Sequence, residues 1–179
     1  FGLAPDVEQG ARLTREACEQ GSEAGCTQLA MLELEGAGPI ERNVAAGKQR
    51  AEALCNGGHG AACALLGKLA TGEKRGKPAL QRAAAWFEKG CEQDDPNSCA
   101  LLGAHLLDGA GVERDEQRGL GLLRRSCRQM QSPQGCSVYA RALLLGADGK
   151  AGVKEGAGLA AGLCAQGDPE ACVMAAGAY

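Results

Sequence analysis

Ten cysteines recur at a fixed period along this chain, and no other feature of the sequence constrains the fold as strongly. The first members of five pairs stand at positions 18, 55, 91, 127 and 164, and the second members at 26, 63, 99, 136 and 172. A fixed period between about 20 and 50 residues is typical of stacked repeat arrays. We therefore predict a single array over residues 1–179, with five units at approximately 5–40, 43–76, 78–112, 115–150 and 153–179.

Each unit reads as a helix, a tight turn, a second helix and a glycine-rich loop. In the third unit the second helix begins at Asp95-Pro96, an N-cap residue followed by a proline that needs no amide donor in the first turn. The same start recurs at Ser132-Pro133 and Asp168-Pro169. The fourth cysteine pair holds one extra residue, which we place in the turn at 130–132. Further helix starts are predicted at Asp6, Asn43 and Asp115, so the fold class is all-α.

The helix hairpin explains the spacing inside each cysteine pair. The first cysteine lies at the end of one helix and the second near the start of the next, so an antiparallel hairpin brings them within the short distance that a disulfide requires. An even number of regularly spaced cysteines indicates an oxidising compartment and an exported protein. The predicted disulfides pair Cys18 with Cys26, Cys55 with Cys63, Cys91 with Cys99, Cys127 with Cys136, and Cys164 with Cys172.

Metal binding and reduced thiols are the alternatives for these cysteines. Zinc sites use a Cys-x2–4-Cys knuckle with further Cys or His nearby, whereas here seven or eight residues separate the cysteines and the chain has only His59 and His105. We therefore predict no metal site and no cofactor. Buried reduced thiols stay open for a single pair and are disfavoured for five.

Composition excludes several classes of partner. The net charge is −3 and acidic and basic residues are interspersed, which lacks the clustered basic face of a nucleic-acid-binding protein. No apolar run approaches the length of a membrane span. The start at Phe1-Gly2-Leu3, without a signal peptide, leads us to expect a processed or trimmed chain, and the cysteines indicate an exported one, periplasmic, outer-surface or secreted.

The sequence carries no recognisable catalytic constellation. No serine is followed by lysine three residues later, as in penicillin-recognising enzymes, and no phosphate-binding or His-Glu-x-x-His motif occurs. His59 and His105 stand without a nucleophile or acid partner in sequence, and Glu33 and Glu35 point to different faces of a helix. We therefore predict that the protein is not an enzyme.

The third unit resembles the Sel1-like repeat family, a relative of the tetratricopeptide repeat. The likeness rests on Leu102-Gly103, on Gly109-x-Gly111-Val112 with Asp115, and on Ala85-Trp86-Phe87-Glu88-Lys89. The cysteine pair in every unit is similar to the cysteine-rich Hcp proteins of Helicobacter. The motifs depart from the pattern at Leu29-Ala30, Tyr139-Ala140 and Gly152-Val153.

The resemblance implies a right-handed α/α solenoid, or superhelix, of five disulfide-stapled repeats with a concave face for a protein or peptide partner. It implies a non-catalytic scaffold or adaptor, with Trp86 in the packed core. The alternative is a penicillin-binding or β-lactamase-like cell-wall-related protein, an activity associated with some cysteine-rich members.

The resemblance also places the Leu-Gly helix of each repeat on the concave face. A competing interpretation is that its leucines are inter-repeat core and its charges serve solubility. The positions expected to face a partner are Met31, Leu34, Lys68, Thr71, Asn97, Ala104, Leu107, Gln134, Arg141 and Leu144.

Overall fold

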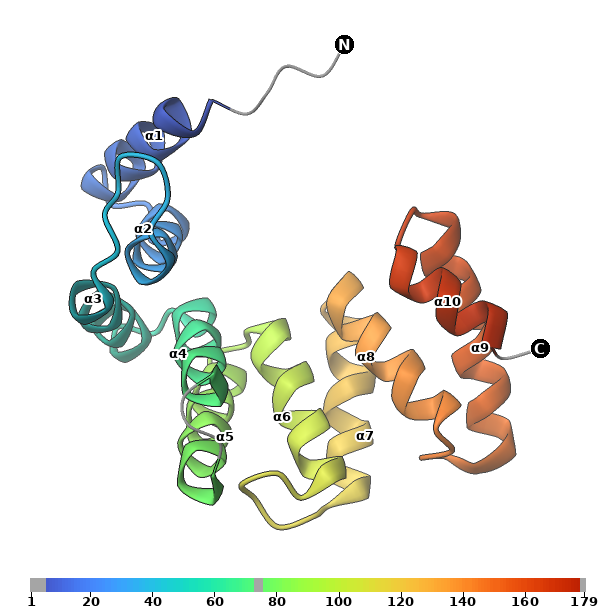
Figure 1. Ribbon diagram of the computed structural model, residues 1–179. Helices are drawn as coiled ribbons and strands as arrows, with labels where there is room; N and C mark the ends of the chain where they lie inside the picture. Colours follow the sequence, from blue (N-terminus) through green and yellow to red (C-terminus); the bar gives the residue numbers. More distant parts are fainter. Residues whose placement is uncertain (1–5, 73–75, 178–179) are drawn as a thin grey trace.

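The protein is an all-α, right-handed solenoid. The computed structural model describes residues 6–72 and 76–177, and these contain ten α-helices and no β-strand. Figure 1 shows successive helix hairpins stacked into an arc. The helices are α1 (Val7–Glu19), α2 (Glu23–Glu35), α3 (Val44–Asn56), α4 (Gly60–Gly72), α5 (Lys77–Glu92), α6 (Pro96–Asp108), α7 (Glu116–Arg124), α8 (Pro133–Leu144), α9 (Gly149–Ala165) and α10 (Pro169–Gly177).

The predicted capping residues begin the helices. Asp95 accepts a hydrogen bond from the Ser98 backbone N–H at 2.6 Å, and Ser132 accepts one from Gly135 at 3.0 Å. Each satisfies a backbone donor that the first helical turn leaves without an intrahelical partner. The same geometry confirms the starts predicted at Asp6, Asn43, Asp115 and Asp168.

We expect loss of a buried cap to cost more than loss of an exposed one. Asp95→Ala should lower the free energy of unfolding by about 1–2 kcal/mol, because the Ser98 N–H would stay buried without its acceptor. Asp6→Ala, which removes an exposed cap, should cost under about 1 kcal/mol. Urea denaturation of both variants measures the difference, and equal losses would contradict the role of burial.

Two helix boundaries differ from the sequence prediction. Helix α9 begins at Gly149, whereas the sequence predicts that the fifth unit, and with it this helix, begins at about residue 153. The extra residue of the fourth cysteine pair is not added to the turn at 130–132. It is absorbed at the end of α7, where Arg125–Gln129 forms a short π-helix, η1. The turn keeps its shape, since Gln131 has a φ of 52° and Asp94 in the preceding repeat has a φ of 58°.

All ten cysteines form disulfides, in the five pairs that the spacing predicts. Each bond joins the end of one helix to the first turn of the next across a short turn. The Cα–Cα distances lie between 4.3 Å and 4.9 Å, because the hairpin turn already brings the two helix ends together. Phe1 and Tyr179 lie outside the described residues, as does most of the charged stretch 73–77.

The first helix and the second helix of each disulfide-linked hairpin lie on opposite sides of the arc. The second helices of adjacent hairpins pack directly, α2 against α4, α4 against α6, and α6 against α8. The first helices are linked by surface ion pairs instead: Arg118 of α7 to Glu88 of α5 at 2.6 Å, and Arg128 of η1 to Glu155 of α9 at 2.8 Å. Closer spacing on one side of a stack makes that side concave, so α2, α4, α6 and α8 form the inner side.

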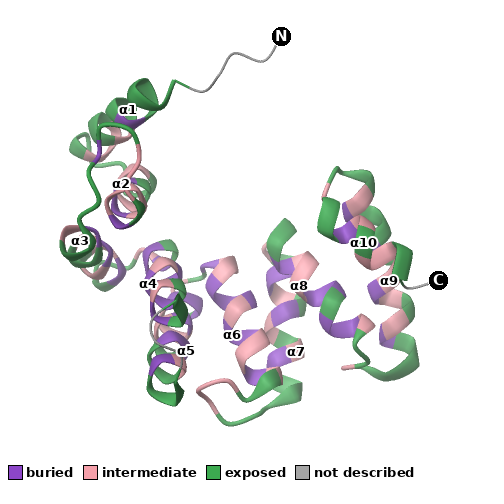
Figure 2. Ribbon diagram, in the orientation of Figure 1, coloured by how far each residue is buried: buried purple, intermediate pink, exposed green. Residues whose placement is uncertain are grey.

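Small residues allow each second helix to approach the helix that follows it in the chain closely. A Cβ at Gly67 would lie 2.2 Å from the Phe87 ring, and one at Gly103 would lie 2.9 Å from the Gly119 carbonyl oxygen. The glycine of the Leu-Gly pattern therefore makes room for the next helix. The preceding leucine, Leu66 or Leu102, is buried in the core. Figure 2 shows buried segments along the helices of the central part of the stack.

Candidate partner-binding surface

The inner side of the arc is the candidate functional surface, and three of its predicted leucines pack against the following hairpin. Leu34 is only 8% exposed and packs against Gly47 of α3. Leu107 packs in the same way against Gly119 of α7, and Leu144 against Gly156 of α9. These three contacts join one hairpin to the next. The competing interpretation therefore accounts for part of their surface. Leu107 and Leu144 stay half-buried, so their contact with a partner stays a prediction.

The other predicted surface positions are open to solvent. Met31, Asn97 and Ala104 are half-buried. Thr71 is exposed, but its hydroxyl donates to the Lys68 carbonyl oxygen at 2.7 Å. The inner side thus carries small, amide and basic side chains beside the half-buried Met31, Leu107 and Leu144. Its fully exposed members are Lys68, Thr71, Gln134 and Arg141.

Lys68 and Arg141 are the only lysine or arginine residues in the described second helices α2, α4, α6, α8 and α10. Both stand five residues after the second cysteine of their repeat, Lys68 in the second unit and Arg141 in the fourth. No ion pair within residues 6–72 and 76–177 involves either side chain, whereas all four arginines of α7 and η1 are paired with a carboxylate. An incoming anion would therefore not have to displace a carboxylate of the protein from these two cations.

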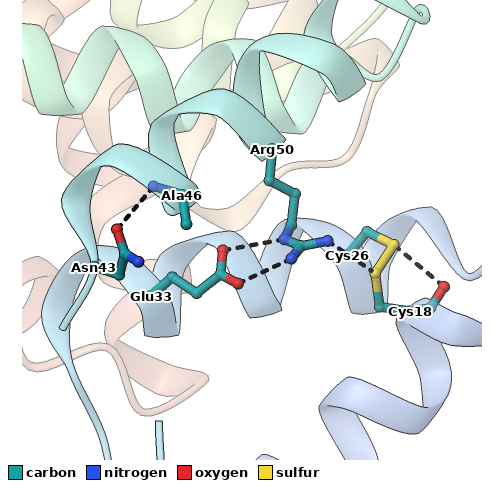
Figure 3. A network of polar contacts seen from close by, with 6 residues as sticks. All are labelled: Cys18, Cys26, Glu33, Asn43, Ala46 and Arg50. Carbon is teal, nitrogen blue, oxygen red and sulfur yellow. Dashed lines mark hydrogen bonds and ion pairs between the residues drawn. A yellow bond between two sulfur atoms is a disulfide. The ribbon is translucent and has the colours of Figure 1, made fainter. Parts of the chain in front are cut away.

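Figure 3 shows a polar network that the sequence did not reveal. Arg50 of α3 makes two hydrogen bonds to the Glu33 carboxylate of α2, from Nε at 3.0 Å and from Nη2 at 2.9 Å. Its Nη1 lies 3.8 Å from the Cys18 sulfur. The hydrogen bond with Glu33 raises the pKa of Arg50 above its ordinary value. Seventeen residues separate Glu33 from Arg50, so only the fold brings them together.

Both histidines are held by structural contacts. His59 Nδ1 lies 2.8 Å from a carboxylate oxygen of Glu23, and this contact joins two helix starts. His105 Nδ1 lies 2.7 Å from the Ala110 carbonyl oxygen, and its ring packs edge-on against Phe87 with centroids 5.2 Å apart. Trp86 is half-buried beneath Lys89, whose Nζ lies 5.9 Å from the ring centroid. Neither histidine contacts a serine, threonine or cysteine that it could activate.

Two kinds of feature are absent from the part of the chain that the structure describes. No group of three or more His, Cys, Asp or Glu side chains there is placed to hold a metal ion. None of its helices is both long enough and apolar enough to cross a membrane.

Comparison with known proteins identifies the family. The model of the Sel1 repeat matches residues 1–22, 24–49, 60–95 and 96–129, which together exceed half of the chain. The chain belongs to the Sel1 repeat family. Proteins of this family generally mediate protein interactions and are generally non-enzymatic solenoids. A comparison with curated proteins found no significant match.

Solved structures of Sel1 repeat proteins share the fold. A protective antigen of uropathogenic Escherichia coli strains, described as displaying an SLR fold, has a TM-score of 0.77 at 20% identity over 96% of this chain. This chain spans 39% of that protein. A Sel1 repeat protein from Oxalobacter formigenes has a TM-score of 0.70 at 17% identity, covering 95% of this chain and 69% of its own. The cysteine-rich protein HcpB of Helicobacter pylori has 26% identity and a TM-score of 0.56, covering 74% of this chain and 94% of its own.

The Sel1 repeat matches also set the phase of the repeat. Residues 60–95 contain α4 and α5, and residues 96–129 contain α6, α7 and η1. These helix pairs have more extensive contacts than the pairs joined by the cysteine turns. In this phase the Cys91–Cys99 disulfide joins two successive Sel1 repeats across the boundary at 95 and 96. The disulfides thus fasten neighbouring repeats together.

Proposed function

We propose that this Sel1 repeat protein is a non-catalytic scaffold that binds a protein or peptide partner on the inner side of its arc. The observation that carries the proposal is the pair of unpaired cations, Lys68 and Arg141, at the same position of repeats that lie two apart. Asn97 and Gln134 add amide groups two residues before the second cysteine of their repeats. An extended segment with acidic groups is the ligand that these side chains complement.

Rigidity supports the same function. The disulfides and the close packing of second helices hold the inner surface in one shape before a partner arrives. A preorganised surface loses little conformational entropy on binding, so more of the contact energy appears as affinity. Five disulfides indicate an oxidising environment outside the cytoplasm, and the structural neighbours are bacterial. We therefore place the scaffold in the periplasm, on the outer surface or in the secreted fraction of a bacterium.

The penicillin-binding or β-lactamase-like alternative receives no support from a specific contact. The Ser-x-x-Lys signature is absent, and both histidines are engaged in structural contacts. Incubation with a chromogenic β-lactam tests this directly, and we expect neither turnover nor covalent labelling.

The binding proposal is tested by reversing the two inner charges. Immobilised protein is used to capture partners from a bacterial envelope extract, and the affinity of each purified partner is then measured by calorimetry. Lys68→Glu with Arg141→Glu should weaken binding by on the order of tenfold or more, because both cations become repulsive toward an acidic ligand. The dissociation constant should also rise with salt concentration.

A matched double variant provides the control. Lys150→Glu with Lys154→Glu makes the same change of charge at exposed positions of α9, a first helix. We expect it to leave the affinity unchanged. Equal weakening by both double variants would mean that net charge, and not the inner surface, governs binding. An unaffected affinity in the Lys68 and Arg141 variant would overturn the proposed surface.

A further inference from the structure

One disulfide differs from the other four in its surroundings. Arg50 Nη1 lies 3.8 Å from the Cys18 sulfur, as Figure 3 shows. No other disulfide sulfur within the described residues has a basic side chain in contact. We infer that Cys18–Cys26 is a redox-sensitive bond, which a dithiol reduces before the other four, and that its reduction releases α1 from the array.

Access to the sulfur is the first support. A cleft of about 360 Å³ lies between α1, α2 and α3, and Cys18, Glu33 and Arg50 line it. Both Cys18 and Cys26 are half-buried. The three central disulfides each contain at least one buried cysteine, so their sulfur atoms are less open to a reductant. Cys164 and Cys172 are also half-buried, but no basic side chain of the described residues contacts their sulfur atoms. This bond therefore serves as the control for the effect of Arg50 at equal exposure class.

The charge beside the sulfur is the second support. A thiolate next to a guanidinium is stabilised, and a cysteine in such a place has a lowered pKa when reduced. Arg50 keeps its charge under all ordinary conditions. Glu33 offsets part of this charge through its two hydrogen bonds to Arg50. The balance between Arg50 and Glu33 therefore sets how strongly the reduced form is favoured.

The reaction proceeds in two exchange steps. A thiolate of the dithiol enters the cleft and attacks the Cys18 sulfur, the Cys18–Cys26 bond breaks, and Cys26 leaves as a thiolate that takes up a proton. The second thiol of the reductant loses its proton and attacks the sulfur that is bound to Cys18. Cys18 then leaves as a thiolate beside Arg50, and the reductant becomes a cyclic disulfide. Two electrons pass from the dithiol to the protein.

Reduction has a structural consequence because α1 has little other anchorage. Its only buried residue is Ala11, which packs with Leu29 of α2 and with Ile40. Burial of one alanine stabilises a helix weakly, since it removes little apolar surface from water. Without the covalent bond α1 separates from α2, and the apolar side chains of Leu29 and Ile40 become accessible.

Stepwise reduction of the oxidised protein tests the inference. The protein is titrated with dithiothreitol and alkylated, and the labelled cysteines are identified by peptide mass spectrometry. Cys18 and Cys26 should be labelled at a lower reductant concentration than Cys164 and Cys172. Trypsin should then cleave at Arg12 and Arg15 in α1 before it cleaves the other helices.

Two variants separate an electrostatic effect from simple loosening. Arg50→Gln should raise the reductant concentration needed for Cys18–Cys26 by on the order of fivefold, because the thiolate loses its cation and faces Glu33. Glu33→Gln should lower it by a similar factor, since Arg50 is no longer neutralised. Both variants break the same ion pair. If both variants lowered the reductant concentration needed for Cys18–Cys26, the role of Arg50 would be overturned. Labelling of Cys164 and Cys172 at a lower concentration than Cys18 and Cys26 in the unmodified protein would overturn the inference as a whole.

Discussion

Replacing Phe87 with alanine is expected to lower the free energy of unfolding by about 3–5 kcal/mol and the melting temperature by roughly 10 °C. The Phe87 side chain is 1% exposed and is one of the two largest fully buried side chains of the structure. It fills the space left by Gly67 of α4 and meets the ring of His105 in α6. Its removal therefore opens a cavity where three helices meet, and glycine at position 67 cannot close it.

The adjacent Trp86 provides a matched control for the loss of an aromatic ring. Trp86 is only half-buried, so Trp86→Ala should destabilise the protein by less than half as much as Phe87→Ala. Phe87→Leu, which keeps most of the volume, should fall between wild type and Phe87→Ala. Thermal unfolding followed by circular dichroism measures all three. A larger loss for Trp86→Ala would contradict the assignment of Phe87 as the central packing residue.

The helices were predictable from the sequence because the signals that start them are local. Asp95-Pro96 and Ser132-Pro133 contain both the cap and the proline, and the structure places the cap where the sequence does. The position of the extra residue was not predictable in this way. Its placement in η1 goes with a tertiary contact: the Ser126 hydroxyl donates to the carbonyl oxygen of Pro96, at the start of α6, at 2.7 Å. Such a contact leaves no trace in the local sequence.

The surface was harder to predict than the fold, for a related reason. A helix inside a solenoid buries one side against its own hairpin and another side against the next, so its apolar residues do not mark a single face. Leu107, which we predicted to face a partner, also packs on Gly119. A glycine twelve residues after the leucine recurs at Leu107 and Gly119 and at Leu144 and Gly156, which is a signal of contact between one disulfide-linked hairpin and the next. Lys68 and Arg141 lie on the same helices and stay exposed.

Removal of a central disulfide should divide the array, whereas removal of a terminal one should only loosen its end. Cys91→Ala with Cys99→Ala is expected to cost about 2–3 kcal/mol, the chain-entropy value for so short a loop. Alanine is chosen over serine because serine would place two hydroxyl groups in a buried site. Cys99 is fully buried and Cys91 is 5% exposed. Helix content should persist at room temperature because each repeat still packs on its neighbours.

The expected signature of this variant is the shape of its unfolding curve. Cys91–Cys99 joins the Sel1 repeats at residues 60–95 and 96–129, so its loss weakens an interface in the middle of the stack. In a one-dimensional array, a weakened central interface lets the two sides unfold separately. Calorimetry should therefore show a broadened or double transition. Cys164→Ala with Cys172→Ala, at the end of the stack, should keep a single transition with early fraying of α10. A single sharp transition in the central variant, or a larger loss in the terminal one, would show that the disulfides stabilise each hairpin alone and do not couple the repeats.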